Sequence, residues 1–183
     1  EKTSVSVEKV WNDEDNQDGI RPEKVSVSLM NGDTVVETAE LSETNSWKYT
    51  FTNLDKKANG VDIDYKVVEN DVPETYESVV SGDKINGFVI TNTHEVYKTS
   101  VNVTKVWQDN NNQDGIRPES VSVSLKNGDT VVSTVELNEA NSWKYTFTGL
   151  DKYADGEEIK YKVVENDVPE TYKSEITGSV TAG

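Results

Sequence analysis

The 183-residue chain contains one segment twice, head to tail. Trp107 lies 96 residues after Trp11, and at this spacing most positions of the two halves match without a gap. Because a repeated segment encodes the same folded unit each time, we expect two tandem domains of one fold. We place them at residues 1–95 and 96–183.

Apolar and polar residues alternate along most of each copy. A period of two is typical of half-buried strands, and Asn31-Gly32 between two such runs predicts a hairpin, because Asn and Gly tolerate the positive φ of a tight turn. About seven short strands without a helical period predict an all-β fold, with one β-sandwich in each copy. In the first copy the predicted strands are residues 5–11, 25–29, 35–41, 47–52, 63–70 and 88–93, with turns at Asn59-Gly60, Val72-Pro73 and Ser81-Gly82.

The charge balance excludes several classes of partner. Lys and Arg number 18 against 34 Asp and Glu, a formal net charge of −16, so neither nucleic acid nor anionic lipid is an expected partner. No apolar run is long enough for membrane insertion, and the N-terminus lacks the apolar core of a signal peptide, as expected of a mature fragment. The chain has no Cys, which excludes disulfides, thiol nucleophiles and Cys-bound zinc.

Three polar residues fall on the apolar parity of their strands. Lys9 lies between Val7 and Trp11 in the apolar row of the first predicted strand, Glu69 ends the row of a later strand, and Asn92 ends that of the last strand. A buried isolated charge costs more than a small domain can tolerate, so these groups must be paired, neutralised or consumed by a reaction. Because desolvation disfavours both charged forms, a buried Lys-Glu pair can become a neutral amine beside a protonated acid.

This trio has more than one interpretation. In the first, the amine of Lys9 attacks the carboxamide of Asn92, while Glu69 hydrogen-bonds the carboxamide oxygen and protonates the departing nitrogen, so that an amide bond forms and ammonia leaves. Since the fold would hold the groups in contact, one slow turnover suffices. In the second, the trio is a buried ion pair beside a hydrogen-bonded Asn, or the strand parity is misassigned.

Several longer motifs occur in the first copy, and four of them return in the second, two unchanged and two with substitutions. They are VEKVWND (7–13), DNQDGIRP (15–22), WKYTF (47–51), YKVVENDVPETY (65–76) and ITNTH (90–94). Together they resemble the Cna B-type repeat of Gram-positive cell-wall-anchored adhesins and pilins, over nearly the whole chain.

The resemblance implies a fold and a reaction. In that family the fold is a reverse-immunoglobulin β-sandwich, and a Lys of the first strand is joined to an Asn of the last strand under catalysis by an acidic residue between them. The matching residues in copy one are Lys9, Asn92 and, as the catalyst, Glu69. In copy two, the matching Lys is Lys105 and the matching acid is Glu165.

Copy two departs from this pattern at its end. Gly183 aligns with Gly87, so the strand that would match residues 88–94 is absent, and the matching Asn would fall at position 188. We therefore expect the second β-sandwich to lack its last strand, because the fragment was cut there or because another segment supplies it. Without such a strand, Lys105 and Glu165 would remain an uncrosslinked pair beside an open groove.

Two other features have weaker functional interpretations. Asp13, Asp15 and Asp18 lie in an acidic loop that could ligate calcium, but the position of its Gly does not fit an EF-hand, and an acidic turn between strands is the alternative. His94 is the single His, so a catalytic triad or a His-rich metal site cannot be assembled. No metal and no cofactor are expected.

Trp47, Tyr49 and Phe51 share one parity of a predicted strand. Such a stripe could stack on a sugar or a peptide. It is more often part of a sandwich core, and the core is our prediction here.

The repeat and the resemblance together predict a structural role. Tandem copies extend reach without a new site, so we expect stalk repeats of an extracellular adhesin on a bacterial cell surface, anchored to the cell wall through a region outside this fragment. Expected partners are neighbouring repeats and a separate ligand-binding domain, through which a host matrix protein would bind. The alternatives are a host-ligand-binding module or a pilin subunit of a covalent fibre, and an enzyme acting on outside substrates is not expected.

Overall fold

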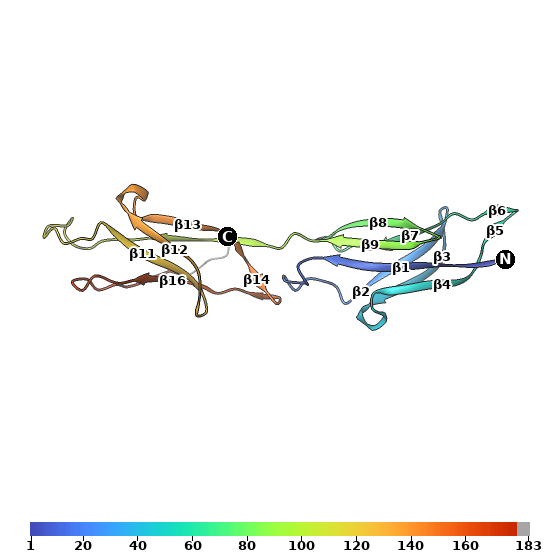
Figure 1. Ribbon diagram of the computed structural model, residues 1–183, viewed down its shortest axis with the longest axis horizontal. Coiled ribbons are helices and arrows are strands. Elements are labelled where there is room, and N and C mark those ends of the chain that lie inside the picture. Colours follow the sequence, from blue (N-terminus) through green and yellow to red (C-terminus); the bar gives the residue numbers. More distant parts are fainter. Residues whose placement is uncertain (179–183) are drawn as a thin grey trace. The chain divides into compact units, whose positions relative to one another are not determined.

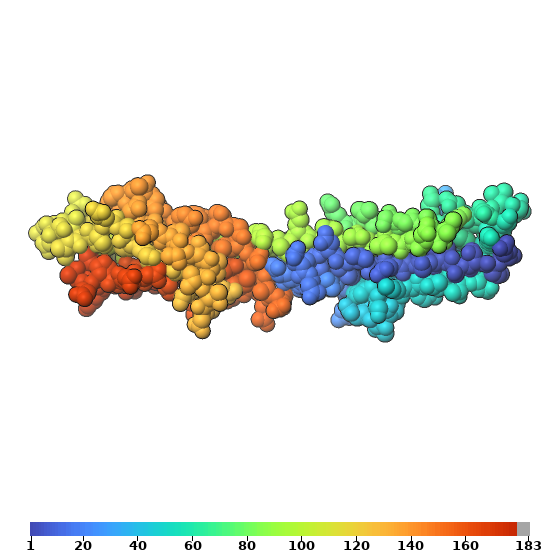
Figure 2. Space-filling model, viewed as in Figure 1, coloured from blue at the N-terminus to red at the C-terminus, as the bar shows by residue number. Residues whose placement is uncertain are grey.

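A computed structural model describes residues 1–178 of the chain. It divides the chain into two compact units, Glu1–Val96 and Tyr97–Gly183, and Figure 2 colours the first from blue to green and the second toward red. In the described residues, regular structure is strand apart from one short 3-10 turn in each unit, which confirms the predicted all-β class. Within the same residues, no helix is long and apolar enough to cross a membrane.

The first unit contains nine strands and one 3-10 turn. They are β1 (Lys2–Asn12), β2 (Lys24–Asn31), β3 (Thr34–Ser42), η1 (Glu43–Asn45), β4 (Lys48–Asp55), β5 (Lys57–Ala58), β6 (Val61–Asp62), β7 (Tyr65–Asn70), β8 (Glu77–Asp83) and β9 (Gly87–Thr93). The predicted hairpin turn at Asn31-Gly32 joins β2 to β3, and the one at Asn59-Gly60 joins β5 to β6.

Two sheets of the first unit pack against each other. The larger has the order β4-β1-β9-β8, the smaller has the order β3-β2-β7, and β5 pairs only with β6. Strand β1 pairs with β4 in antiparallel fashion over residues 2–8 and with β9 in parallel fashion over residues 7–12. Figure 1 shows β1 and β9 side by side. The first and last strands of the unit are therefore neighbours in one sheet.

One apolar core lies between the two sheets. Trp47 and Phe51 belong to it as predicted, whereas Tyr49 is 36% exposed and its hydroxyl donates to Glu37 Oε1. Two of the three aromatic residues are thus core residues. The core is formed by Val5, Val7, Val25, Val27, Leu29, Ala39, Leu41, Trp47, Phe51, Leu54, Tyr65, Val67, Phe88 and Ile90.

Strand β8 was not predicted, and the proposed turn at Ser81-Gly82 lies inside it. Six of its seven residues are exposed, so its sequence lacks the alternation that marks a half-buried strand. Pairing with β9 forms this edge strand. Gly82 has a φ of +87°, and a Cβ there would lie 2.1 Å from the carbonyl oxygen of Gly87, so the strand pair requires glycine at this position.

Two predicted strand starts are also wrong. Strand β4 begins at Lys48 rather than Trp47, because Ser46 and Trp47 have φ values of +54° and +59° and leave the 3-10 turn in a left-handed conformation. Strand β7 begins at Tyr65 rather than at residue 63.

The second unit repeats most of this arrangement. Its elements form a pair β10-β13, a sheet β12-β11-β16 and a pair β14-β15. They are β10 (Lys98–Thr104), β11 (Ser120–Asn127), β12 (Thr130–Asn138), η2 (Glu139–Asn141), β13 (Lys144–Asp151), β14 (Tyr153–Ala154), β15 (Glu157–Glu158) and β16 (Tyr161–Asn166).

No strand follows β16 in the part of the second unit that the structure describes. Residues 173–178, which match most of β8, are not a strand there, because β8 itself is held only by β9. Strand β10 ends at Thr104, the counterpart of Glu8. In the first unit, the part of β1 beyond Glu8 pairs only with β9, and the described residues of the second unit include no such strand. The core also differs, since its buried residues form two clusters instead of one.

Candidate functional site

The three polar residues singled out in the sequence lie together in the first unit. Lys9 is on β1, Asn92 is on the adjacent β9, and Glu69 reaches them from β7 in the opposite sheet. The predicted parity holds, because Lys9 and Asn92 are 3% and 0% exposed and the Glu69 side chain is 2% exposed. The trio therefore bridges the two sheets at the end of the core.

The carboxylate of Glu69 lies between the other two groups. Its Oε1 accepts a hydrogen bond of 2.9 Å from Asn92 Nδ2, and its Oε2 lies 3.8 Å from Lys9 Nζ. From the sequence, the acid is expected at the carboxamide oxygen, whereas in the structure it contacts the carboxamide nitrogen. Asn92 Oδ1 and Lys9 Nζ are buried and have no hydrogen-bond partner among the described residues.

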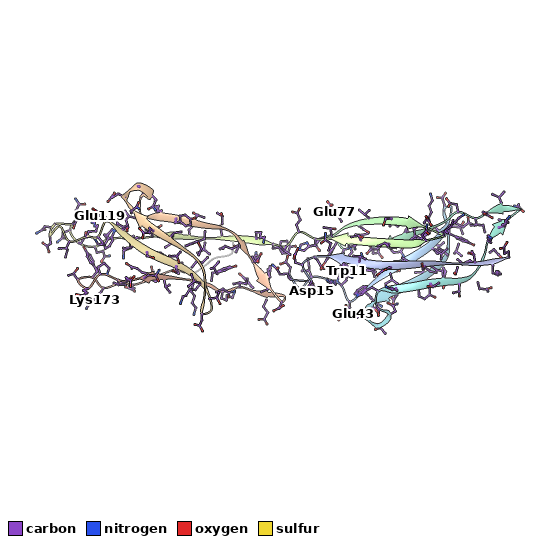
Figure 3. The ribbon with its side chains drawn as sticks, viewed as in Figure 1. Trp11, Asp15, Glu43, Glu77, Glu119 and Lys173 are labelled. Carbon is purple, nitrogen blue, oxygen red and sulfur yellow. The ribbon has the colours of Figure 1, made fainter. Side chains whose placement is uncertain are left out.

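The surroundings of Lys9 disfavour its charge. Desolvation by burial lowers the pKa of Lys9 to about 8, although the negative charges of Glu69 and Asp13 oppose the shift. Nζ lies 4.2 Å from the ring centroid of Trp11, and Figure 3 labels Trp11 on β1. A lysine with this pKa loses its proton far more readily than an exposed lysine, as an amine nucleophile must.

A fourth residue of the site was missed in the sequence. Ser78 on β8 donates a hydrogen bond of 2.6 Å to Glu69 Oε2, and its strand register places it opposite Asn92. Since β8 itself has no sequence signature, no pattern indicated that a serine at this position would reach the site.

The arrangement contains the parts of an amide-forming reaction. It places an amine with a lowered pKa beside a carboxylate, and that carboxylate contacts the nitrogen of a carboxamide. An acid at this place can protonate a departing nitrogen as the amine attacks the carboxamide carbon. Burial excludes water, which would otherwise solvate the amine and compete with it.

In the second unit the corresponding Lys and Glu form a closer ion pair. Lys105 Nζ lies 3.1 Å from Glu165 Oε1 and 3.0 Å from Oε2, and the two side chains are 16% and 7% exposed. No Asn of the described residues joins them. The pair lines a groove of about 640 Å³ between β10, β16 and residues 174–178.

The three acidic residues considered for calcium point to different places. Asp13 accepts hydrogen bonds from Arg21 at 2.6 and 3.0 Å and from the Tyr76 hydroxyl at 2.7 Å. The Asp15 side chain is fully exposed, and Asp18 contacts His94. Their carboxylates therefore do not converge. Burial raises the pKa of the Asp13 carboxyl, but these hydrogen bonds outweigh it and hold that pKa below its usual range.

His94 has a structural position beside this loop. One ring nitrogen, Nε2, lies 2.7 Å from Asp18 Oδ2, and the other, Nδ1, lies 3.0 Å from the carbonyl oxygen of Thr75. The imidazole thereby connects the end of β9 to two loops of the first unit.

The fold and this site define a class, namely tandem β-sandwich repeats with an amine, an acid and a carboxamide buried between the sheets. The chain belongs to the Cna protein B-type domain family, whose model matches residues 5–93 and 101–183. The resemblance found in the sequence motifs is therefore confirmed.

Two relatives support this assignment. The collagen adhesin of Staphylococcus aureus is 46% identical over 166 residues, which make up 90% of this chain and 14% of that protein. The crystal structure of two B repeat units (B1B2) of the collagen binding protein (Cna) of Staphylococcus aureus matches with a TM-score of 0.87 at 39% identity. That match covers 97% of this chain and 48% of the solved one, so the chain spans about half of that structure.

Proposed function

We propose that the first unit forms an intramolecular isopeptide bond between Lys9 Nζ and Asn92 Cγ. The observation that carries this proposal is the buried contact of Glu69 with both partners, together with the two buried atoms, Lys9 Nζ and Asn92 Oδ1, that lack hydrogen bonds. Buried polar atoms normally have such partners. Unsatisfied atoms on the amine and the carboxamide are therefore expected if the two groups are reactants of one bond.

The reaction balances with these three residues alone. The Nζ–Cγ bond forms as the Cγ–Nδ2 bond breaks, and Glu69 gives its proton to Nδ2, which leaves as ammonia. Glu69 then takes a proton from the attacking Nζ, so the acid is regenerated. The reaction happens once in each molecule and needs no cofactor. It uses only groups of the chain itself and acts on no outside substrate.

We further propose that both units are stalk repeats of a bacterial surface adhesin. Tandem copies of one fold, family membership and the similarity to a collagen adhesin support this role. The repeats would stand outside the cell, in contact with neighbouring repeats, within a protein anchored to the cell wall through another region. A separate domain of that protein would bind the host ligand, for which the name of the relative suggests collagen.

The intact mass of the purified chain tests the bond. We expect it to fall short of the calculated mass by one ammonia, whereas Lys9→Met and Glu69→Gln should show the full mass. A loss of two ammonia molecules would mean that the second unit has also found a partner. A full mass in the unsubstituted chain, with a folded first unit, would leave only a buried ion pair.

A further inference from the structure

Both oxygens of the Glu69 carboxylate are held by neutral donors. Asn92 Nδ2 donates to Oε1 at 2.9 Å, and Ser78 Oγ donates to Oε2 at 2.6 Å. The terminal torsion of Glu has broad, roughly two-fold preferences, so a single contact would leave the carboxyl plane loosely defined. Two contacts from neighbouring positions of β8 and β9 fix it.

The ammonium group of Lys9 does not replace the serine. Nζ lies 3.8 Å from Oε2, beyond hydrogen-bond distance. In the described residues, Ser78 is therefore the hydrogen-bond donor to the oxygen that faces Lys9.

The second unit repeats the contact without the other partner. Ser174, the counterpart of Ser78, donates a hydrogen bond of 2.5 Å to Glu165 Oε2. It does so although residues 173–178 are not a strand there and no Asn of the described residues contacts Glu165. The serine thus holds the acid independently of the carboxamide and of strand pairing.

We propose that Ser78 is a positioning residue for the isopeptide reaction, an inference that rests on the proposed function. It holds Oε2 so that Oε1 is presented to the nitrogen of Asn92. Its hydroxyl is suited to this because it can donate to the ionised carboxylate and, by rotating, accept from the protonated acid. One side chain thereby supports Glu69 both before and after it takes up the proton.

Two variants with side chains of the same shape separate the effect of the hydroxyl from the effect of side-chain volume. Ser78→Thr keeps the hydroxyl and Ser78→Val lacks it, and both residues favour strands. Unreacted, unfolded chain is recovered from inclusion bodies in urea, folding is started by dilution, and the loss of ammonia is followed by intact mass in acid-quenched samples. A hydrogen bond to a charged group corresponds to about a 10- to 100-fold effect, so we expect Ser78→Val to react about 10- to 100-fold more slowly than Ser78→Thr.

Rescue by the conservative variant excludes a merely structural effect. Thr and Val fill the same space at position 78, but only Thr can donate to Glu69 Oε2, so the rate should stay near the wild-type rate in Ser78→Thr and fall in Ser78→Val. Equal rates for the Thr and Val variants, in a wild-type chain that does lose ammonia, would overturn this inference and leave the proposed function intact. A wild-type chain that folds without losing ammonia would overturn both.

Discussion

The pKa of Lys9 depends on the protein environment that surrounds it. An exposed lysine is almost entirely protonated at neutral pH, whereas burial lowers the pKa of Lys9 to about 8. Glu69 lies close enough to exchange a proton with it but not close enough for a hydrogen bond. One proton on Lys9 or Glu69 therefore lies within reach of both groups.

The shared proton predicts how the crosslinking rate depends on pH. The ion pair and the reactive form, a neutral amine beside a protonated acid, contain the same number of protons, so their ratio does not change near neutrality. Above about 8 the pair loses that proton, and an ionised Glu69 cannot protonate the departing nitrogen. We expect the rate of ammonia loss in refolding chain to fall about tenfold for each further pH unit. A rate that instead rises through this range would show that deprotonation of Lys9 alone is limiting.

The residues of the trio were predictable because each falls in an apolar row of its strand. Parity depends only on the period of a strand, so it placed Lys9, Glu69 and Asn92 inward without knowledge of the sheet order. Ser78 was not predictable, because an exposed edge strand carries no period and its partner lies in another sheet. The contact between Asp18 and His94 joins a loop to a strand end, and sequence separation alone does not indicate such pairs.

Strand β9 influences more of the fold than its own seven residues. It pairs with both β1 and β8, and its Phe88 and Ile90 belong to the single core of the first unit. In the second unit, where the described residues include no such strand, Val103 and Val163 are only partly buried, whereas their counterparts Val7 and Val67 are 2% and 4% exposed. The repeat predicted the same fold twice, and this strand accounts for where the two units differ.

The glycine in β8 offers a direct test of how that strand is held. Gly82→Ala should destabilise the first unit by about 2–4 kcal/mol, because the new Cβ would meet the Gly87 carbonyl and φ is positive. Its counterpart Gly178 also has a positive φ, but nothing lies within 4 Å of its Cβ position. Gly178→Ala should therefore cost about 1 kcal/mol or less. Urea denaturation of the two variants measures the difference, and equal losses would contradict the placement of β8 against β9.

The bond between the first and last strands should also stabilise the first unit. It would close a loop of more than 80 residues, for which the chain-entropy account of a disulfide gives about 4 kcal/mol. Glu69→Gln removes the bond with little change in packing, so it should lower the free energy of unfolding by about that amount. The substitution should also steepen the decrease of the unfolding free energy with urea concentration, since a chain without the bond exposes more surface on unfolding. An unchanged midpoint and slope of the urea denaturation curve in Glu69→Gln would argue against the bond.

The position of the proposed bond determines how force passes through the first unit. Strands β1 and β9 run parallel, and Lys9 and Asn92 lie near the ends at which both strands finish. A pull applied to the two ends of the unit would pass along β1, through the bond and out after β9. The residues between them would carry no load, which suits a stalk that must keep its length.

Pulling single molecules makes this prediction measurable. With the bond in place, the first unit cannot release the more than 80 residues between Lys9 and Asn92, which as an extended chain would add roughly 280 Å. The wild-type chain should lack this step, and Glu69→Gln should show it. A step of that length in both proteins would mean that the unit unfolds completely under force.

The identity of the linked residues tests the proposed bond directly. Tandem mass spectrometry of a tryptic digest should find one branched peptide in which the segment containing Lys9 is joined to the segment containing Asn92, lighter than the two segments together by one ammonia. Trypsin should not cleave after Lys9 in that product. An unmodified Lys9 with normal cleavage after it, in a chain whose first unit is folded, would show that Lys9 and Asn92 are not joined.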